Sequence, residues 1–301
     1  MSGDEDVLLT VSQQKSLADF CVLRELGSGS YSNVYFATSK SDGHKYALKI
    51  CSKERISRER KVKSVFREKN ALMVLSTAQK KKPFIVMLYC TFQDESSLYF
   101  VLGYAEHKDL AEKMIKIKTL DLDTVRFVIS ELITAIAYCH ENGILHRDIK
   151  PGNMLIKDDH HVMLGDFGEC ITIEENEKTI ASDSNRKCSF VGSHLYVTPE
   201  VLRGQAVDET CDYYARITKN LFQWPEDFPC PKAKSAILEF LEPKKEDRLG
   251  SKHKNGFSGI KEHEYFTGID WDNLWRLDSP LARYYKKEAT CDIVDDPLDQ
   301  F

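Results

Sequence analysis

Two short motifs that lie close together constrain this chain more than any other feature. Residues 146–153 read His-Arg-Asp-Ile-Lys-Pro-Gly-Asn, and Asp148 of this run precedes the triplet Asp166-Phe167-Gly168 by 18 positions. Either motif alone could arise by chance, but both in this order and at this spacing could not. Asp148, Asn153 and Asp166 offer carboxylate and amide oxygens, which can accept protons and bind hard cations. We therefore expect these residues to form the chemical centre of the molecule.

The two motifs resemble the catalytic loop and the metal-binding turn of protein kinases. The resemblance implies that Asp148 orients the substrate hydroxyl, and that Asn153 and Asp166 hold the Mg²⁺ ions that bridge the phosphates of ATP. Lys150 would lie beside the γ-phosphate and offset its charge. A lysine at this place is typical of serine/threonine kinases.

A glycine-rich turn is expected upstream. The apolar run 20–23 leads into Gly27, Ser28, Gly29 and Ser30, and a strand that enters such a turn lets backbone amides approach phosphate oxygens with no Cβ in the way. Ser32 stands where the family pattern has its third glycine. Alone, this loop would be interpreted as an ordinary tight turn.

Lys49 and Glu68 are the expected phosphate clamp. Lys49 ends the run Tyr-Ala-Leu-Lys that resembles the kinase strand whose lysine holds the α- and β-phosphates. The helical spacing of Val65, Leu72 and Leu75 predicts a helix over 62–75 with these residues on one face. Glu68 shares that inward face, which is unusual for a solvated glutamate and suits an ion pair with Lys49.

The order of elements predicts an α+β fold of two lobes, a small antiparallel β lobe with one main helix and a mostly helical large lobe. We expect a flexible segment at 1–18, the small lobe at 19–105, the large lobe at 106–270 and a tail at 271–301. Residues 103–105 would form the hinge, and a nucleotide would bind in the cleft between the lobes.

The resemblance also implies the residues that contact the nucleotide. Val34, Ala47 and Leu155 would enclose the adenine, and Leu102 would be the gatekeeper. Ala105 would bind the base through its backbone, and Asp109 would contact the ribose.

Composition limits the setting and the partners. The chain has 301 residues, a net charge of −5 and a pI near 6.0, which predicts no nucleic-acid surface. Its acidic start, its lack of a run of about 18 apolar residues and Ser2 in place of a myristoylated glycine predict no membrane anchor. Nine cysteines without a Cys-x-x-Cys pair favour reduced thiols. We expect a cytoplasmic protein.

Further segments resemble one group of serine/threonine kinases. Residues 190–193 with 196–200, the stretch 89–104 and the glycine-rich turn are similar to the 3-phosphoinositide-dependent kinases of the AGC group, over about Asp19 to Leu274. Glu200 would pair with Arg248, an ion pair that the family buries between helices. The resemblance implies that the protein substrates are the activation loops of other AGC kinases.

It also implies a docking groove on the small lobe for a hydrophobic tail of those substrates. Ser57 and Phe66 depart from the family pattern there, and the charged residues nearby are equally typical of a solvated surface. The matching positions are Lys53, Ile56, Val62, Val65, Lys69, Gln93 and Leu98.

Ser189 is the expected regulatory phosphosite. It lies between Asp166 and Glu200 along the chain, where a phosphate can pair with Arg147 and order the segment. The competing interpretation is an ordinary loop serine. Cys188 beside it is expected to be a bystander.

The chain departs from the family after Ala215. Arg216 resembles a residue about 25 positions further on in the family pattern, and the helix that assembles the large lobe is missing. Its apolar burial, at about 25 cal/mol per Å², is large beside a net stability of about 5–15 kcal/mol. A spliced or misassembled sequence, a genuine minimal lobe and a pseudokinase all remain open.

Two functions therefore follow from the sequence. The first is an active Ser/Thr protein kinase, favoured because Lys49, Glu68, Asp148, Asn153 and Asp166 are all present. The second is a catalytically impaired scaffold that binds nucleotide and partner kinases. The segment that ends in Pro-Glu at 199–200 disfavours a small-molecule kinase.

Overall fold

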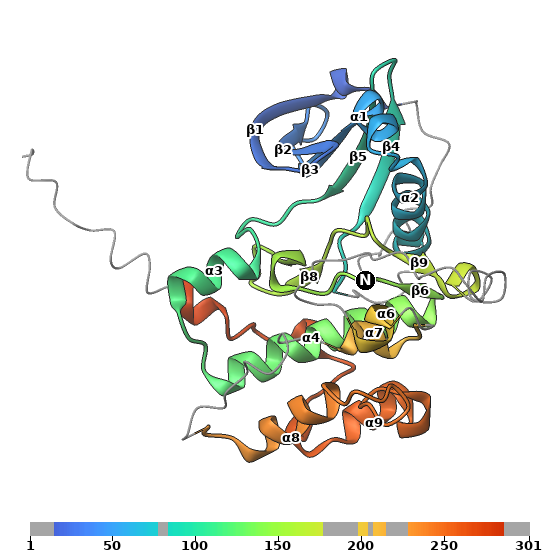
Figure 1. Ribbon diagram of the computed structural model, residues 1–301. Coiled ribbons are helices and arrows are strands. Elements are labelled where there is room, and N and C mark those ends of the chain that lie inside the picture. The colour runs from blue at the N-terminus through green and yellow to red at the C-terminus, as the bar shows by residue number, and fades with distance from the viewer. Residues whose placement is uncertain (1–14, 78–83, 177–197, 204–206, 215–227, 286–301) are drawn as a thin grey trace, which may run out of the picture. The chain divides into compact units, whose positions relative to one another are not determined.

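The computed structural model describes residues 15–77, 84–176, 198–203, 207–214 and 228–285 (Figure 1). The chain divides into two compact units, Met1–Val65 with Met87–Tyr104 and Phe66–Val86 with Ala105–Phe301. The first is built on a β-sheet and the second is mostly helical, which confirms the expected α+β class.

The first unit contains one five-stranded antiparallel sheet in the order β1-β2-β3-β5-β4. Figure 1 shows β1, β2 and β3 as the blue part of this sheet. The elements of this unit are η1 (Leu17–Asp19), β1 (Phe20–Ser28), β2 (Ser32–Ser39), β3 (Lys45–Ser52), α1 (Lys53–Arg58), β4 (Leu88–Gln93) and β5 (Ser97–Gly103).

Side chains that alternate along these strands build the core of the sheet. Phe20, Ala37, Leu48, Tyr99 and Val101 form a buried cluster. Aromatic stacking reinforces the cluster, with the ring centroids of Phe92 and Tyr99 at 4.6 Å.

The turn between β4 and β5 is organised by one aspartate. The carboxylate of Asp94 accepts hydrogen bonds from the backbone amides of Ser96 and Ser97, at 2.9 and 2.8 Å, and from the hydroxyl of Tyr99 at 2.6 Å. These bonds lower the pKa of Asp94 to about 2, and the bond from Tyr99 has the largest effect.

Helix α2 (Val62–Thr77) crosses from the first unit to the second, because the division falls between Val65 and Phe66. It confirms the helix predicted over 62–75, with Val65, Leu72 and Leu75 buried. We expected this whole helix in the small lobe, and the limits of the two lobes stay a prediction.

Short strands and helices make up the rest of the second unit. They are α3 (Leu110–Ile117), α4 (Leu122–Glu141), β6 (Ile144–Leu145), η2 (Pro151–Asn153), β7 (Met154–Ile156), β8 (Val162–Leu164), β9 (Ile171–Thr172), α6 (Pro199–Leu202), α7 (Thr210–Tyr213), α8 (Pro231–Phe240), η3 (Lys252–Lys254), α9 (Gly256–Glu262), η4 (Glu264–Phe266) and η5 (Leu274–Arg276). β6 pairs with β9, and β7 pairs with β8.

Helix α4 is the central packing element of this unit, and it contacts β8, β6, α7 and η4. Asp121 caps its start by accepting a hydrogen bond from the Thr124 amide at 2.8 Å. The chain leaves the helix through Gly143, whose φ of +70° only glycine adopts readily. Apolar residues at helical spacing over 122–142 predict this helix from the sequence, with Gly143 as its stop, and both are confirmed.

A buried acid–base pair joins α4 to β8. The Glu131 carboxylate contacts Nδ1 of His161 and accepts the Val162 amide at 3.1 Å. Burial by itself lowers the pKa of His161, but the hydrogen bond and the charge of Glu131 raise it above its ordinary value.

Within the described residues, no helix is long and apolar enough to cross a membrane.

Candidate active site

The catalytic loop holds Asp148 in one orientation. This side chain is buried, and its Oδ2 accepts hydrogen bonds from Lys150 Nζ at 2.6 Å and from Asn153 Nδ2 at 3.0 Å. Asn153 Nδ2 also donates to the main-chain oxygen of Asp148 at 2.7 Å. Two of the expected functional residues therefore contact the carboxylate of a third.

His146 links this loop to the Asp-Phe-Gly turn. Its Nδ1 accepts the backbone amide of Asp148 at 3.2 Å, so Nε2 carries the proton and donates to the oxygen of Gly165 at 3.0 Å. The imidazole is fully buried and packs against the Phe167 ring at 4.7 Å. His146 therefore fixes the position of the loop relative to the turn.

Asp212 in α7 supports the loop from below its backbone. Its two carboxylate oxygens accept the amides of His146 and Arg147 at 2.8 and 2.7 Å, and Oδ2 lies 2.9 Å from His140 Nε2. Burial alone raises the pKa of Asp212, but the bonds and charges of His140 and His146 and the Arg147 amide lower it on balance. The family resemblance implies that Asp212 supports this loop, and these bonds confirm it, whereas nothing in the sequence indicated His140.

The two expected metal ligands have suitable donor atoms. Asn153 gives both donated bonds through Nδ2, so its amide oxygen is the atom that faces away from Asp148 and can take a cation. Asp166 is exposed, and its backbone has a φ of +57°. One amide and one carboxylate oxygen fit Mg²⁺, which completes its shell with phosphate oxygens and water. Among the described residues, no group of three or more His, Cys, Asp or Glu side chains forms a further metal site.

In the first unit, four expected nucleotide residues share one face of the sheet. Val34 pairs with Lys49 across β2 and β3, and Ala47 pairs with Leu102 across β3 and β5. Paired residues point to the same side, and residues 47 and 49 are two positions apart on one strand. The side chains of all four therefore lie on one surface.

The glycine-rich turn adjoins this surface, because Gly27 pairs with Val34. The Gly29 amide donates to the oxygen of Ser32 at 2.7 Å, which closes the turn. A Cβ on Gly27 would meet nothing within 4 Å, and its φ is not positive. Neither packing nor backbone conformation explains the glycine at 27, so the space beside it is open to a ligand.

Lys49 and Glu68 are each buried, with 8% and 1% of their surface exposed. They belong to different compact units. The Lys49–Glu68 ion pair therefore stays a prediction.

In the second unit, Asp109 and Leu155 lie side by side as an isolated antiparallel bridge. Asp109 also caps α3, since Oδ1 accepts the Glu112 amide at 2.9 Å. Ala105 opens the same segment, and it is half-buried. The ribose and adenine contacts expected for these three residues stay predictions.

The expected docking residues differ in exposure. Ile56 and Val65 lie in the core, at 4% and 3% exposed, whereas Val62 is 45% exposed. Lys53 donates through Nζ to the oxygen of Asp94, beside the β4–β5 turn. Gln93 is exposed. Leu98 is half-buried in β5, and Lys69 belongs to the second unit, so the groove stays a prediction.

Ser189, Ser193 and Ala215 lie outside the described residues. Arg147, the expected partner of a phosphate on Ser189, donates through Nε to the oxygen of Glu169 at 2.8 Å. Burial lowers the pKa of this guanidinium.

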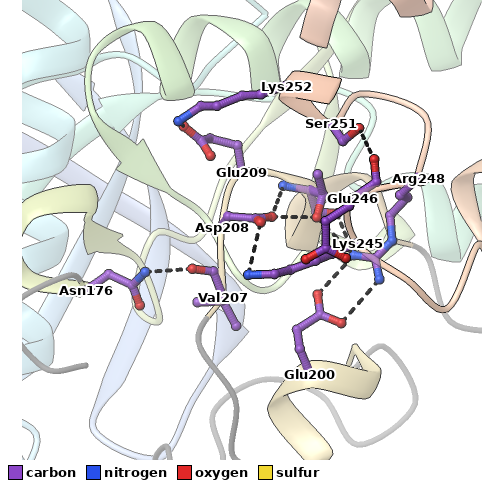
Figure 2. A network of polar contacts seen from close by, with 11 residues as sticks. Asn176, Glu200, Val207, Asp208, Glu209, Lys245, Glu246, Arg248, Ser251 and Lys252 are labelled. Carbon is purple, nitrogen blue, oxygen red and sulfur yellow. Dashed lines mark hydrogen bonds and ion pairs between the residues drawn. The ribbon is translucent and has the colours of Figure 1, made fainter. Parts of the chain in front are cut away.

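Glu200 and Arg248 form the expected buried ion pair, which Figure 2 shows at the centre of a polar network. The contact is bidentate, with N–O distances of 2.9 and 3.2 Å. Arg248 also donates to Thr210 in α7 at 3.1 Å, and its guanidinium lies 4.4 Å from the Tyr214 ring centroid.

Two further ion pairs belong to the network in Figure 2. Lys245 lies 3.3 Å from Asp208, and Lys252 lies 2.9 Å from Glu209. Sequence reasoning missed these four residues, because surface charges of both signs are common and no spacing rule links them.

Comparison with known proteins agrees with this geometry. Residues 20–265 match the family model described as the protein kinase domain. The chain is 32% identical to the 3-phosphoinositide-dependent protein kinase 1 of Rattus norvegicus over 91% of its own length and 51% of the relative. It is 32% identical to the putative 3-phosphoinositide-dependent protein kinase 2 of Homo sapiens, over 91% of its own length and 72% of the relative.

The serine/threonine-protein kinase PKH2 of Saccharomyces cerevisiae is 34% identical over 92% of this chain and 27% of the relative. The chain thus spans about half the length of the rat relative and less of the yeast one. The matched family model and the catalytic loop together show that the chain belongs to the protein kinase domain family, with AGC-type relatives among the 3-phosphoinositide-dependent kinases.

Proposed function

We propose that this chain is a Ser/Thr protein kinase that transfers the γ-phosphate of ATP to hydroxyl groups of proteins. The observation that carries the proposal is the fixed Asp148 carboxylate, contacted by Lys150 and Asn153 inside a loop that Asp212 supports. Phosphoryl transfer needs little covalent help from a protein and depends on positioning and on charge stabilisation. This arrangement supplies both.

Each residue has a role in the transfer. Asp148 orients the substrate hydroxyl and accepts its proton, while the hydroxyl oxygen bonds to the γ-phosphorus and the bond to the β–γ bridging oxygen breaks. Lys150, whose Nζ already lies at Asp148 Oδ2, offsets negative charge on the transferred group. Asn153 and Asp166 would hold Mg²⁺, which supplies neutralisation of the phosphate charge when bound.

The small-lobe residues would bind the nucleotide. The shared face of Val34, Ala47, Lys49 and Leu102 would receive the adenine and the phosphates, beside the open turn at Gly27. Lys49 would contact the α- and β-phosphates and pair with Glu68.

The substrates proposed are activation loops of other AGC kinases, recognised through a hydrophobic tail. The similarity to 3-phosphoinositide-dependent kinases supports this proposal. The exposed Val62 and Gln93 would be the accessible part of the docking groove, and the buried Ile56 and Val65 would shape it from beneath. Phosphorylation of Ser189 and a cytoplasmic location belong to the same proposal.

A second candidate function is a nucleotide-binding scaffold for partner kinases with impaired catalysis. The observation in its favour is the sequence after Ala215, where the family pattern skips about 25 residues of buried helix. Nucleotide contacts come from other segments, so binding would persist while turnover falls.

Transfer of phosphate from ATP–Mg²⁺ to an AGC activation-loop peptide separates the two functions. Asp148→Asn removes the carboxylate that orients the hydroxyl, and Lys49→Ala removes the phosphate contact. Each should lower transfer at least about a hundredfold. Lys252→Ala is the matched control, because this lysine is 82% exposed. If activity survives in both active-site variants, the proposed kinase function is excluded.

Calorimetry of ATP binding adds an independent test of the metal ligands. Wild-type protein should bind ATP in a Mg²⁺-dependent way, and Asp166→Ala should lose most of that dependence. Asn153→Ala should lose less of it. Equal Mg²⁺ dependence in Asp166→Ala and wild type would exclude the role of Asp166.

A further inference from the structure

Tyr285, near the end of the described chain, is the centre of an aromatic and cationic cluster. Its ring centroid lies 4.3 Å from that of His107 and 4.6 Å from that of His160. Lys113 Nζ lies 3.5 Å from the same ring. The two imidazoles stack on each other at 4.7 Å. We call these four residues the Tyr285 cluster.

The cluster joins three separate parts of the second unit to the C-terminal segment. His107 lies in the segment 105–109 before α3, which we call the linker. Lys113 lies in α3, and His160 lies in the turn between β7 and β8. In Figure 1 the red C-terminal segment runs beside α3. Ser279 adds a bond to the same turn, donating through Oγ to the oxygen of His160 at 2.7 Å.

The linker and β7 are hydrogen-bonded to each other next to this cluster. The His107 amide donates to the oxygen of Ile156 at 3.0 Å, and the Ile156 amide donates to the oxygen of Lys108 at 2.7 Å. Asp109 then bridges Leu155. The linker and β7 therefore carry three of the proposed nucleotide contacts, which are Ala105, Asp109 and Leu155.

The linker and the turn between β7 and β8 each contain a residue in the left-handed backbone region. Lys108 has φ of +61° and His160 has φ of +63°, which is uncommon for residues other than glycine, although histidine adopts it more often than most. Such conformations persist only when the surroundings hold them. The ring of Tyr285 lies against His160 itself and against His107, the neighbour of Lys108.

The residue before Tyr285 has a different anchor. Tyr284 donates through its hydroxyl to Asp121 Oδ2 at 2.8 Å and accepts the Asp121 amide at 2.8 Å. Arg283 lies 3.6 Å from the same carboxylate. Tyr284 thus fastens the segment to the start of α4, away from the linker, which makes it a matched control.

We propose that Tyr285 is a positioning residue for nucleotide binding. By filling the space between His107 and His160, its ring holds the linker against β7 and so sets the places of Ala105, Asp109 and Leu155. The proposal rests on the proposed nucleotide site. It acts through the linker, and Tyr285 itself touches neither ATP nor the reacting atoms.

The test compares Tyr285→Ala, Tyr285→Phe and Tyr284→Phe in the full chain. Tyr285→Ala should weaken ATP–Mg²⁺ binding in calorimetry, and raise the KM for ATP, by about tenfold. kcat at saturating ATP should stay within about twofold, because the catalytic loop is held separately by Asp212. Tyr285→Phe keeps the ring and should bind like wild type, as should Tyr284→Phe.

Amide hydrogen exchange gives a readout that needs no nucleotide. The amides of His107 and Ile156 should exchange faster in Tyr285→Ala and at the wild-type rate in Tyr284→Phe. Unchanged exchange at both amides, or ATP affinity equal to that of Tyr284→Phe, would overturn the proposal. So would a fall in kcat with no change in KM.

The outcomes separate this proposal from the proposed kinase function. Absence of phosphate transfer in the wild type would defeat the kinase assignment, while calorimetry and exchange would still decide the role of Tyr285. Normal transfer with no effect of Tyr285→Ala would defeat the role of Tyr285 alone.

Discussion

Arg147 shows how much single residues of the catalytic loop depend on their partners. Its φ of +65° is a conformation that costs about 1–3 kcal/mol for a residue of this type. The Asp212 carboxylate offsets this cost by accepting the Arg147 amide, with the His146 amide on its other oxygen. Because the pKa of Asp212 is lowered, the carboxylate is an anion at neutral pH and both bonds are charge-assisted.

Asp94 permits a pH prediction in the first unit. The Tyr99 hydroxyl bond and the turn amides lower its pKa from 3.8 to about 2 in the folded state. A carboxyl group whose pKa is lower in the folded state stabilises the fold at any pH above its pKa in the unfolded state. This contribution is lost as the pH falls from about 3.8 to about 2. Carboxyl NMR titration should find the low value in wild type and a higher one in Tyr99→Phe. Titration of both near 3.8 would contradict the role of Tyr99.

The cysteines should differ sharply in reactivity. Burial raises the pKa of Cys170 to about 12 and holds the pKa values of Cys139 and Cys211 well above their ordinary value, whereas Cys21 is exposed. The thiolate is the reactive form. A maleimide at pH 7.5 should therefore label Cys21 in the folded protein and spare the other three, as peptide mass spectrometry can show. Denatured protein, in which all are labelled, is the control.

At the scale of elements, short α7 depends on contacts from outside itself. A helix of four residues has little stability of its own. Arg248, which Figure 2 shows paired with Glu200, donates to Thr210 of this helix. His140 of α4 contacts its Asp212. The position of the catalytic loop thus depends on residues that follow it by a hundred positions along the chain.

Arg248→Ala should destabilise the protein strongly. It leaves the Glu200 carboxylate buried without its cation, which costs about 3–5 kcal/mol. Lys252→Ala breaks the exposed pair with Glu209 and should cost about 0–1 kcal/mol. Urea unfolding at pH 7 measures both. Equal losses in the two variants would show that burial does not set the strength of these pairs.

At the scale of the whole molecule, the sequence after Ala215 is the feature from which we expect the largest loss of turnover. The alignment to the rat relative is 298 residues long, yet it takes in 91% of this 301-residue chain, so the relative has residues with no counterpart here. A missing segment in the large lobe requires such a difference. The expected result is nucleotide binding with low stability and low turnover.

Insertion of the relatives' segment after Ala215 tests this expectation. About 25 added residues that form the family helix should bury apolar surface worth about 25 cal/mol per Å², and so raise both Tm and kcat. A flexible Gly-Ser insert of equal length is the control and should raise neither. If the chain without an insert already turns over like its longer relatives, the scaffold argument is wrong.

The sequence by itself determined the elements whose chemistry or period is local. The protein kinase family, the helix at α2, the helix α4 with its Gly143 stop and the Glu200–Arg248 pair were all predicted correctly. Motif residues are constrained by what they bind, and helical faces repeat every few residues, so both leave a mark that can be recognised without a fold.

Tertiary packing decided the contacts between residues that are distant in sequence. The Glu131–His161 pair, the contact of His140 with Asp212 and the Tyr285 cluster follow no spacing rule. A glutamate or a tyrosine is compatible with either solvent or core as far as the local sequence goes. Only the packing of α4 on β8, or of the C-terminal segment on the linker, removes that side chain from water and selects its partner.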